Sequence, residues 1–351
     1  MIDQDNMSAL SRQLRDTVRF ARSFNAQASS FAQWQSTTRA FVVEALGVGN
    51  ARAAQSRTLE QQDHKTHHTR LVELTFSSGE KTEAFLLLPF TKNKSPAVLL
   101  LHDHGSRFDI GKEKLIQTSD PDKARSSEEW IKRCYGERYL GDILVKRGYV
   151  VLCADALGWS SREGNGYDAQ QALAANLMQF GTSLAAIVAS EDLQAALYLS
   201  ALPEVDERFV ASMGFSFGGF RAWQVAALTP AISASVAINW MGQLAGLMQP
   251  GANLLRGQSA YYMLHPQLAG KLDYPDIAAL VAPRHALFYA GDQDPHFPGE
   301  TVEAAFAALA SVWTAASAAA HLETRIWPAG HVFGPTQQDA AIQWMDSVFG
   351  R

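Results

Sequence analysis

The sequence predicts an α/β fold in which a mostly parallel central sheet is covered by helices on both faces. Three observations predict this class. Short apolar runs such as 97–101 and 209–213 are typical of strands that are buried on both faces. Helix-compatible stretches alternate with these runs, and a polar or glycine-containing segment follows most of them. The pattern covers residues 69–351, which we interpret as one domain behind a helical N-terminal extension and connector, residues 1–68.

The N-terminal extension carries helical patterning from residue 8 to about residue 46, where a glycine cluster ends it. Residues 51–68 are polar and predict a connector outside the sheet. Without an apolar helical face or a carboxylate partner beside them, its histidines favour a solvated connector over a metal site. These histidines are His64, His67 and His68.

The first strands of the sheet are expected after this connector. Segments 70–76 and 83–89 flank a short polar turn and predict an antiparallel hairpin. The apolar run 97–101 predicts a buried strand that ends in His102-Asp103-His104-Gly105. Residues 106–140 are charged and irregular, which predicts an insertion with a helical piece near Trp130. A further buried strand is expected at 149–155.

The second half of the chain continues the alternation. The stretch 168–202 is helix-compatible, with Ser190 as a capping residue and Pro203 as its stop. Residues 240–275 interrupt the alternation and predict a cap or substrate-pocket insertion. The other strands are expected at 209–213, 234–238, 286–290 and 324–327, and the other helices at 220–228, 299–320 and 336–349.

Composition limits the function classes. The chain is 47% apolar and 19% charged, an ordinary globular mixture. Its net charge of −5, without a long run of one sign, argues against a nucleic-acid partner. The first residues lack the basic and apolar pattern of a signal peptide, and no stretch reaches the ~18 apolar residues of a membrane span. We therefore expect a cytoplasmic protein without a membrane partner. Its two cysteines, Cys134 and Cys153, do not suggest a disulfide framework.

The pentapeptide Gly214-Phe215-Ser216-Phe217-Gly218 fits the pattern G-x-S-x-G of a nucleophile elbow. A buried strand leads into it and a helix-compatible stretch leads out, as this turn requires. A serine at such a turn has a strained backbone, and its hydroxyl is presented at the edge of the sheet. The glycines leave room for the close crossing of strand and helix. Ser216 is therefore the candidate nucleophile.

Two further residues complete the candidate site. Functional loops of an open α/β sheet gather at the carboxyl ends of its strands, where Ser216, Asp294 and His331 are all expected. Their order along the chain is that of a nucleophile, acid and base triad. His331 would accept the serine proton, and Asp294 would orient the imidazole. The backbone N–H groups of Phe217 and His104 are the candidate oxyanion donors, with Asp103 as the neighbouring choice for the second.

Several alternatives stay open at this point. Asp292 and Asp294 both follow the same strand, and Asp294 is preferred because it lies at the outer end of the turn. Asp155 favours a structural role in its loop. His102 and His104 form an H-x-H pair, but no third metal ligand is evident, so no metal or cofactor is expected. Aromatic residues could line a substrate pocket or belong to the core; the candidates for the pocket are Trp159, Trp240 and Tyr261.

On these residues, the chain resembles the α/β-hydrolase superfamily, in its dienelactone-hydrolase-like and acetyl-xylan-esterase-like branch. The resemblance covers about residues 70–350 and rests on five segments, which are Leu99–Gly105, Glu191–Asp206, Gly214–Gly219, Gly291–Pro295 and Gly330-His331. The chain departs from the family pattern at two positions. Dienelactone hydrolases proper use a cysteine nucleophile where this chain has Ser216, and many relatives have glycine where it has Asp103.

The resemblance implies an α/β-hydrolase fold and a serine esterase that works through an acyl-enzyme. Its expected partner is a small ester, an acetylated carbohydrate being one example, and it requires no cofactor. One alternative is a serine peptidase similar to the catalytic domain of prolyl oligopeptidase, which a panel of amides and esters separates from an esterase. Another is a hydrolase fold retained as a non-catalytic binding module, which would not label with a fluorophosphonate. The helical N-terminus is a candidate contact surface for a homo-oligomer.

Overall fold

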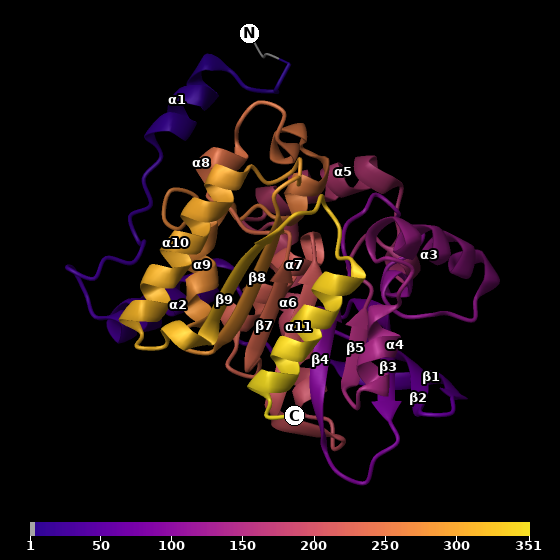
Figure 1. Ribbon diagram of the computed structural model, residues 1–351. Helices are drawn as coiled ribbons and strands as arrows, with labels where there is room; N and C mark the ends of the chain where they lie inside the picture. The colour runs from indigo at the N-terminus through magenta and orange to yellow at the C-terminus, as the bar shows by residue number, and fades with distance from the viewer. Residues whose placement is uncertain (1–3) are drawn as a thin grey trace.

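The strands form one nine-stranded sheet within residues 4–351, the part of the chain that the computed structural model describes (Figure 1). Their order across the sheet is β1-β2-β3-β5-β4-β6-β7-β8-β9. The first three strands and the β3–β5 pair are antiparallel, and all other pairs are parallel. The predicted mostly parallel sheet is therefore confirmed. The strands are β1 (Gln55–Asp63), β2 (His67–Thr75), β3 (Lys81–Pro89), β4 (Ser95–Leu101), β5 (Val150–Ala154), β6 (Val205–Phe215), β7 (Ala234–Ile238), β8 (His285–Gly291) and β9 (Leu322–Trp327).

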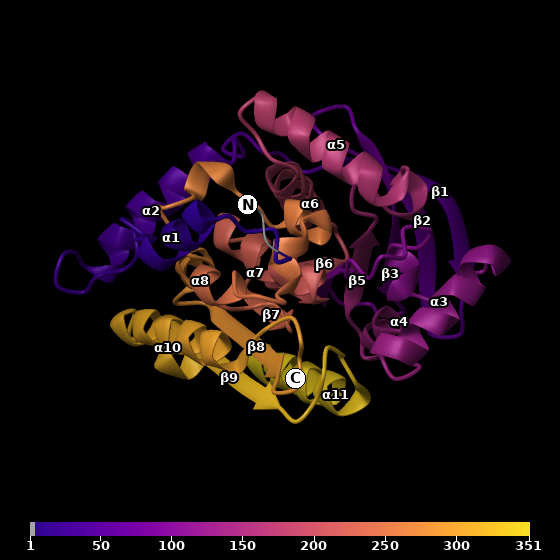
Figure 2. The same ribbon diagram turned by 90° about the horizontal axis from the view of Figure 1, so that it is seen from above.

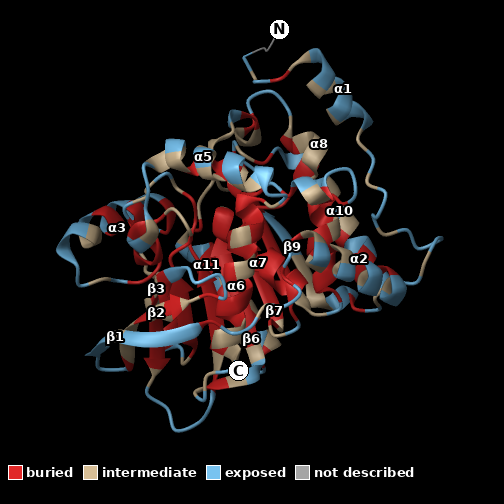
Figure 3. Ribbon diagram, turned by 180° about the vertical axis from the view of Figure 1, so that it is seen from behind, coloured by how far each residue is buried: buried red, intermediate tan, exposed pale blue. Residues whose placement is uncertain are grey.

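Helices cover both faces of this sheet (Figure 2). Side chains of α2, α6, α7, α9 and α10 belong to one buried apolar cluster, and those of α3, α4 and α11 belong to a second. Figure 3 shows the buried residues concentrated in the central strands and in α6 and α7. The helices are α1 (Ala9–Thr17), α2 (Phe31–Ala45), α3 (Pro121–Cys134), α4 (Leu140–Lys146), α5 (Gly166–Gln179), α6 (Leu184–Ser200), α7 (Phe217–Leu228), α8 (Leu244–Leu247), α9 (Tyr274–Ala278), α10 (Gly299–Ala315) and α11 (Pro335–Val348).

The polar segment expected to be a connector is a strand instead. Within residues 51–68, β1 pairs with β2 along its whole length at the edge of the sheet, and β2 begins at His67. All but one of the β1 residues are exposed. Both faces of β1 meet solvent, so its side chains show no apolar alternation and its backbone pairing alone defines it. This explains why the pattern of the sequence did not reveal a strand.

The helix-compatible stretch 168–202 forms two helices, α5 and α6, rather than one. The chain turns at Gly181, whose φ of 77° suits glycine. The capping residue of α6 is Ser183, whose side chain accepts a hydrogen bond from the N–H of Ala186, and the predicted cap Ser190 lies inside the helix. No single helix within residues 4–351 has the length and hydropathy of a membrane span, and only the bent pair α5 and α6 meets those criteria when taken together.

The register of the parallel strands brings five loops to one edge of the sheet. Leu101 at the end of β4 pairs with Gly214, and Phe215 at the end of β6 pairs with Ile238. Farther along, Ile238 pairs with Tyr289, and Gly291 at the end of β8 pairs with Trp327. The segments that follow β4, β6, β7, β8 and β9 therefore begin side by side, which is the arrangement that an α/β site needs.

Candidate active site

Ser216 occupies a strained turn between β6 and α7. Its φ of 55° and ψ of −124° lie in a region that non-glycine residues rarely adopt. Its N–H donates a hydrogen bond to the carbonyl oxygen of Ile238 at 2.8 Å, and its own carbonyl accepts from the N–H of Phe220 at the start of α7. Such strain persists only where the surrounding structure enforces it, and it is typical of functional positions.

Three glycines around Ser216 allow β6, α7 and the neighbouring strands to approach closely. A Cβ on Gly214 would lie 2.3 Å from the backbone of Gly218, and one on Gly218 would lie 2.0 Å from the carbonyl oxygen of Leu101. A Cβ on Gly219 would lie 2.7 Å from the carbonyl oxygen of Ile238. Because all these contacts are with backbone atoms, no side-chain movement can relieve them. The predicted role as spacers is supported for Gly214 and Gly218, and the structure adds Gly219 to them.

We expect Gly218→Ala to lower the free energy of unfolding by about 3 kcal/mol, because the added methyl group collides with the end of β4. Urea denaturation measures this change. Gly299→Ala is the matched control, because Gly299 begins α10 and has open space where a Cβ would stand. It should leave stability unchanged or raise it by up to about 1 kcal/mol. Equal losses in the two variants would contradict this explanation of the elbow.

A hydrogen-bonded relay joins Ser216 to His331 and Asp294. The Nε2 atom of His331 lies 2.8 Å from Ser216 Oγ, and its Nδ1 atom lies 2.6 Å from Asp294 Oδ2. These distances suit proton transfer between nucleophile and base. The Asp294 side chain is 1% exposed and that of His331 is 20% exposed. The structure thus places a buried carboxylate behind an imidazole that remains open toward the serine.

The position of Asp294 explains why it, and not Asp292, reaches His331. Asp294 is buried, whereas Asp292 is exposed. The second carboxylate oxygen of Asp294 accepts a hydrogen bond from the N–H of His296 at 2.9 Å, which fixes the acid in its turn. The ring of His296 packs edge-on against His331 at 4.8 Å, and burial together with the charge of His331 lowers the pKa of His296.

Asn239 is a residue of this site that the pattern of the sequence did not single out. Its side-chain amide donates hydrogen bonds to the carbonyl oxygens of Gly330 and Val332, one on each side of His331. Its φ of 50° is one that asparagine tolerates better than most residues. The sequence could have indicated Asn239, because it is the polar residue directly after β7, at the same edge of the sheet as the other candidates.

The residues of the two candidate oxyanion donors line the same cavity as Ser216. Phe217 is the first residue of α7, where a backbone N–H has no acceptor within the helix. His104 follows β4, and no acceptor in the described part of the chain binds its N–H. Burial, followed by the charge of Lys114, lowers the pKa of the His104 imidazole to about 3, which keeps the ring neutral. Phe217 and His104 therefore each offer a backbone N–H that is unpaired within residues 4–351, and neither side chain carries a negative charge that would repel an oxyanion.

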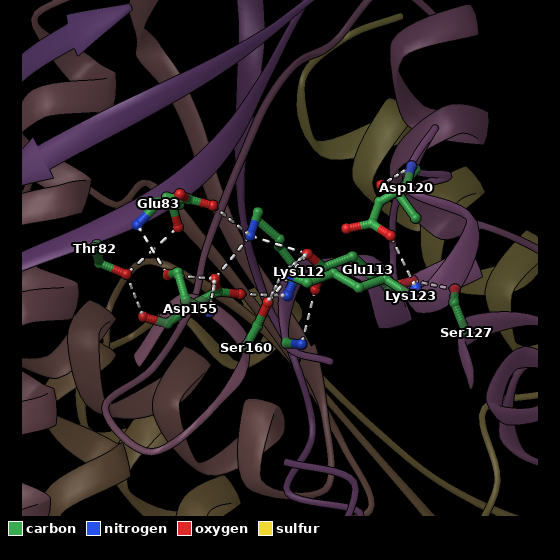
Figure 4. Close-up of polar contacts among 12 residues, drawn as sticks. Thr82, Glu83, Lys112, Glu113, Asp120, Lys123, Ser127, Asp155 and Ser160 are labelled. Atoms are coloured by element: carbon green, nitrogen blue, oxygen red, sulfur yellow. Dashed lines mark hydrogen bonds and ion pairs between the residues drawn. The ribbon is translucent and has the colours of Figure 1, made fainter. Parts of the chain in front are cut away.

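His102 and Asp155 have structural partners. The Nδ1–H of His102 donates to the carbonyl oxygen of Asp103 at 2.9 Å, and its Nε2 accepts from the N–H of Ala156 at 3.0 Å. Asp155 accepts hydrogen bonds from the N–H and the ammonium of Lys112, both at 2.8 Å (Figure 4). Both nitrogens of His102 are thus occupied, and Asp155 organises its loop, as expected. No group of three metal-ligating side chains occurs among residues 4–351.

A cavity of about 560 Å³ lies beside the relay. The two predicted insertions, 106–140 and 240–275, both contribute to its wall, which contains Arg133 and Arg256. Its polar lining residues also include Asn253, Gln258 and Ser259. The volume is that of a pocket for a small molecule.

The three aromatic residues proposed for this pocket have different positions. Trp240 lines the cavity. Trp159 does not line it; the residue is fully buried, and its Nε1–H donates to the carbonyl oxygen of His104 at 3.0 Å. Tyr261 is half-buried against the core and also lies outside the lining. Sequence patterns do not separate pocket aromatics from core aromatics, because both need an apolar neighbourhood.

Comparisons with known proteins agree with this fold. A model of the dienelactone hydrolase family matches residues 136–344, a segment that contains Ser216, Asp294 and His331. YtaP of Bacillus subtilis (strain 168), a hydrolase by name, is 28% identical over 263 residues, which are 74% of this chain and 81% of YtaP.

Solved structures with low sequence identity have the same α/β-hydrolase fold. A glucuronoyl esterase from Solibacter usitatus has a TM-score of 0.65 at 13% identity, covering 95% of this chain and 98% of its own. Acetyl xylan esterase 1 from Thermoanaerobacterium sp. JW/SL YS485 has a TM-score of 0.60 at 17% identity, covering 98% of this chain and 99% of its own.

Proposed function

Because this chain belongs to the dienelactone hydrolase family and is therefore an enzyme of the hydrolase type, we propose that it is a serine esterase that cleaves a small carboxylic ester through an acyl-enzyme. Ser216 is the nucleophile, His331 the general base and acid, and Asp294 the residue that orients the imidazole. The site needs no cofactor in this reaction.

One observation carries the proposal, namely the continuous relay from Ser216 Oγ through His331 to the buried Asp294. Its two links measure 2.8 and 2.6 Å, and it opens on a cavity of about 560 Å³. A serine hydroxyl is a weak nucleophile unless a base removes its proton as it attacks. The Asp294 carboxylate favours the tautomer of His331 that carries its proton on Nδ1, which leaves Nε2 free to accept the serine proton.

The reaction follows from these positions. Ser216 Oγ attacks the ester carbonyl carbon while His331 takes its proton, and the carbonyl oxygen becomes an oxyanion. The N–H groups of Phe217 and His104 stabilise that charge, each contributing roughly 3 kcal/mol to lowering the barrier. His331 then protonates the departing alcohol, which leaves an acyl group on Ser216. Water, activated by the same histidine, attacks the acyl-enzyme and restores the serine.

The lining of the cavity supports a polar ester. Asn253, Gln258 and Ser259 offer hydrogen-bonding groups, and Arg133 and Arg256 add positive charge. The cavity also has apolar lining residues, among them Trp240, Leu247 and Phe297, which can hold an acyl group, while its polar side chains can bond the hydroxyl groups of an acetylated carbohydrate. We therefore propose short acyl esters of polar alcohols as the substrate class.

A panel of chromogenic substrates tests this function. We expect p-nitrophenyl acetate to be hydrolysed with a kcat/KM at least about 100-fold above that of p-nitrophenyl octanoate. Acetanilides, which are the corresponding amides, should react far more slowly than either ester. A fluorophosphonate probe should label the folded protein at one serine. Amides that react as fast as the esters would favour a peptidase instead, and folded protein that neither labels nor hydrolyses any ester would favour a binding module.

A further inference from the structure

A buried lysine lies directly behind the loop that carries the second candidate oxyanion donor. Lys114 belongs to the turn Lys112–Lys114, in the insertion between β4 and β5, and its side chain is 0% exposed. Its ammonium donates hydrogen bonds to the carbonyl oxygens of Asp103 at 2.9 Å and of His104 at 2.8 Å. Burying a charged group is costly unless it is well bonded, so an unusual buried cation calls for an explanation.

The partners of Lys114 differ from those of its neighbour Lys112. Lys112 forms ion pairs with Asp155, Glu113 and Glu83, at 2.8, 3.0 and 3.4 Å (Figure 4). Lys114 has no carboxylate at hydrogen-bond distance within residues 4–351, since Asp103 Oδ2, the nearest, is 3.8 Å from its Nζ. Its hydrogen bonds go to backbone carbonyls alone. The ammonium of Lys114 therefore hydrogen-bonds two peptide groups, while its ion pair with the Asp103 carboxylate is the longer contact, at 3.8 Å.

The geometry of a trans peptide links these carbonyls to the candidate site. In each planar peptide unit, the C=O and the following N–H point in opposite directions. A carbonyl of Asp103 that faces Lys114 thus directs the N–H of His104 away from Lys114, and the carbonyl of His104 does the same for the N–H of Gly105. Asp103, His104 and Gly105 all line the catalytic cavity, whereas Lys114 does not.

We propose that Lys114 is a positioning residue for the oxyanion site: its ammonium fixes the loop 103–105 and polarises the peptide groups whose N–H groups face the reacting carbonyl. The inference rests on the proposed function. A cation on a carbonyl oxygen increases the positive charge on the N–H of the same peptide, because hydrogen-bonded dipoles polarise one another. Its charge also stabilises a nearby oxyanion directly, without reorganisation during the reaction.

Other buried side chains hold the same loop. Trp159 Nε1–H also donates to the carbonyl oxygen of His104, at 3.0 Å. The carboxylate of Asp103 accepts from Trp130 Nε1–H at 3.1 Å and from Tyr135 O–H at 2.5 Å. The loop is thus fixed through its backbone and through one side chain. Lys114 is the charged member of this set of donors, which gives it an electrostatic effect that the other donors lack.

Steady-state kinetics and one inhibitor test this role. We expect Lys114→Met to lower kcat for p-nitrophenyl acetate by about 100-fold while KM changes less than about threefold. The Ki of a trifluoromethyl ketone, whose adduct with serine carries an oxyanion, should rise by the same factor as kcat falls. Lys114→Gln should restore part of both, since its amide can still donate to one carbonyl. It also serves as the test variant if Lys114→Met does not fold.

The control is Ser127→Ala, which removes a different hydrogen bond from the same turn. The hydrogen bonds of Ser127 Oγ go to the carbonyl oxygen of Glu113 and to the Tyr139 hydroxyl, and neither partner belongs to loop 103–105. If Ser127→Ala and the Lys114 variants lose kcat to the same extent, or if the inhibitor binds the Lys114 variants normally, the positioning role is wrong. Failure of the proposed function is distinct from this result: an unaltered protein that forms no acyl-enzyme overturns both.

Discussion

Replacing Ser216 with alanine is expected to lower kcat for p-nitrophenyl acetate by roughly four to six orders of magnitude. The hydroxyl that would form the covalent bond is absent from this variant, and a residual rate would come only from the oxyanion donors and substrate binding. The variant should fold, because a methyl group fits where the hydroxymethyl group was. It should also fail to label with a fluorophosphonate. Steady-state assays and gel-based labelling measure the two effects.

Ser212→Ala is the matched control for this substitution. Ser212 lies four residues earlier on β6, is fully buried, and donates to the carbonyl oxygen of Ala222 at 2.8 Å. Its replacement should cost about 1 kcal/mol of stability and leave kcat within about threefold of the unaltered protein. If Ser216→Ala hydrolysed the ester as well as Ser212→Ala does, the assignment of the nucleophile would be wrong.

Replacing Asp294 with asparagine is expected to lower kcat by about four orders of magnitude while leaving the fold intact. An asparagine amide can present its NH₂ group to His331 Nδ1, which favours the imidazole tautomer that carries its proton on Nε2. That tautomer cannot accept the proton of Ser216. The variant also lacks the negative charge that stabilises the imidazolium during the reaction. The loss should therefore appear in kcat, with KM little changed.

Asp292→Asn provides the comparison within the same turn. Asp292 is exposed, whereas Asp294 is buried against His331. We expect this variant to keep kcat within about threefold of the unaltered protein, because its carboxylate does not reach the relay. Equal losses in the Asp292 and Asp294 variants would mean that the charge of the turn, rather than the hydrogen bond to His331, matters for activity.

The parallel part of the fold could be predicted because its strands are buried on both faces. Their apolar runs, such as the one that leads to Ser216, are strong local signals, and each polar residue at a strand end pointed to the same sheet edge. The edge strand β1 could not be predicted in this way. Its side chains are almost all exposed, so it left no apolar pattern, and only the backbone pairing with the next strand, β2, defines it.

In the candidate site, too, some features could be predicted from the sequence and others could not. Ser216, Asp294 and His331 stand in a recognisable order, but the pairing of His331 with Asp294 rather than Asp292 depends on burial that only the fold determines. Lys114 gave no signal, because a lysine in a charged insertion normally lies in solvent. Its role depends on two carbonyl groups about ten residues earlier in the chain, and no side-chain pattern encodes such a contact.

The central claim is that Ser216 becomes acylated during ester cleavage. Rapid-quench mass spectrometry of the unaltered protein, mixed with p-nitrophenyl acetate and digested after acid quenching, tests it most directly. We predict one acetyl group on the peptide that contains Ser216, formed as fast as the first turnover, and none in Ser216→Ala. Steady hydrolysis without an adduct, or an adduct on another residue, would contradict the account.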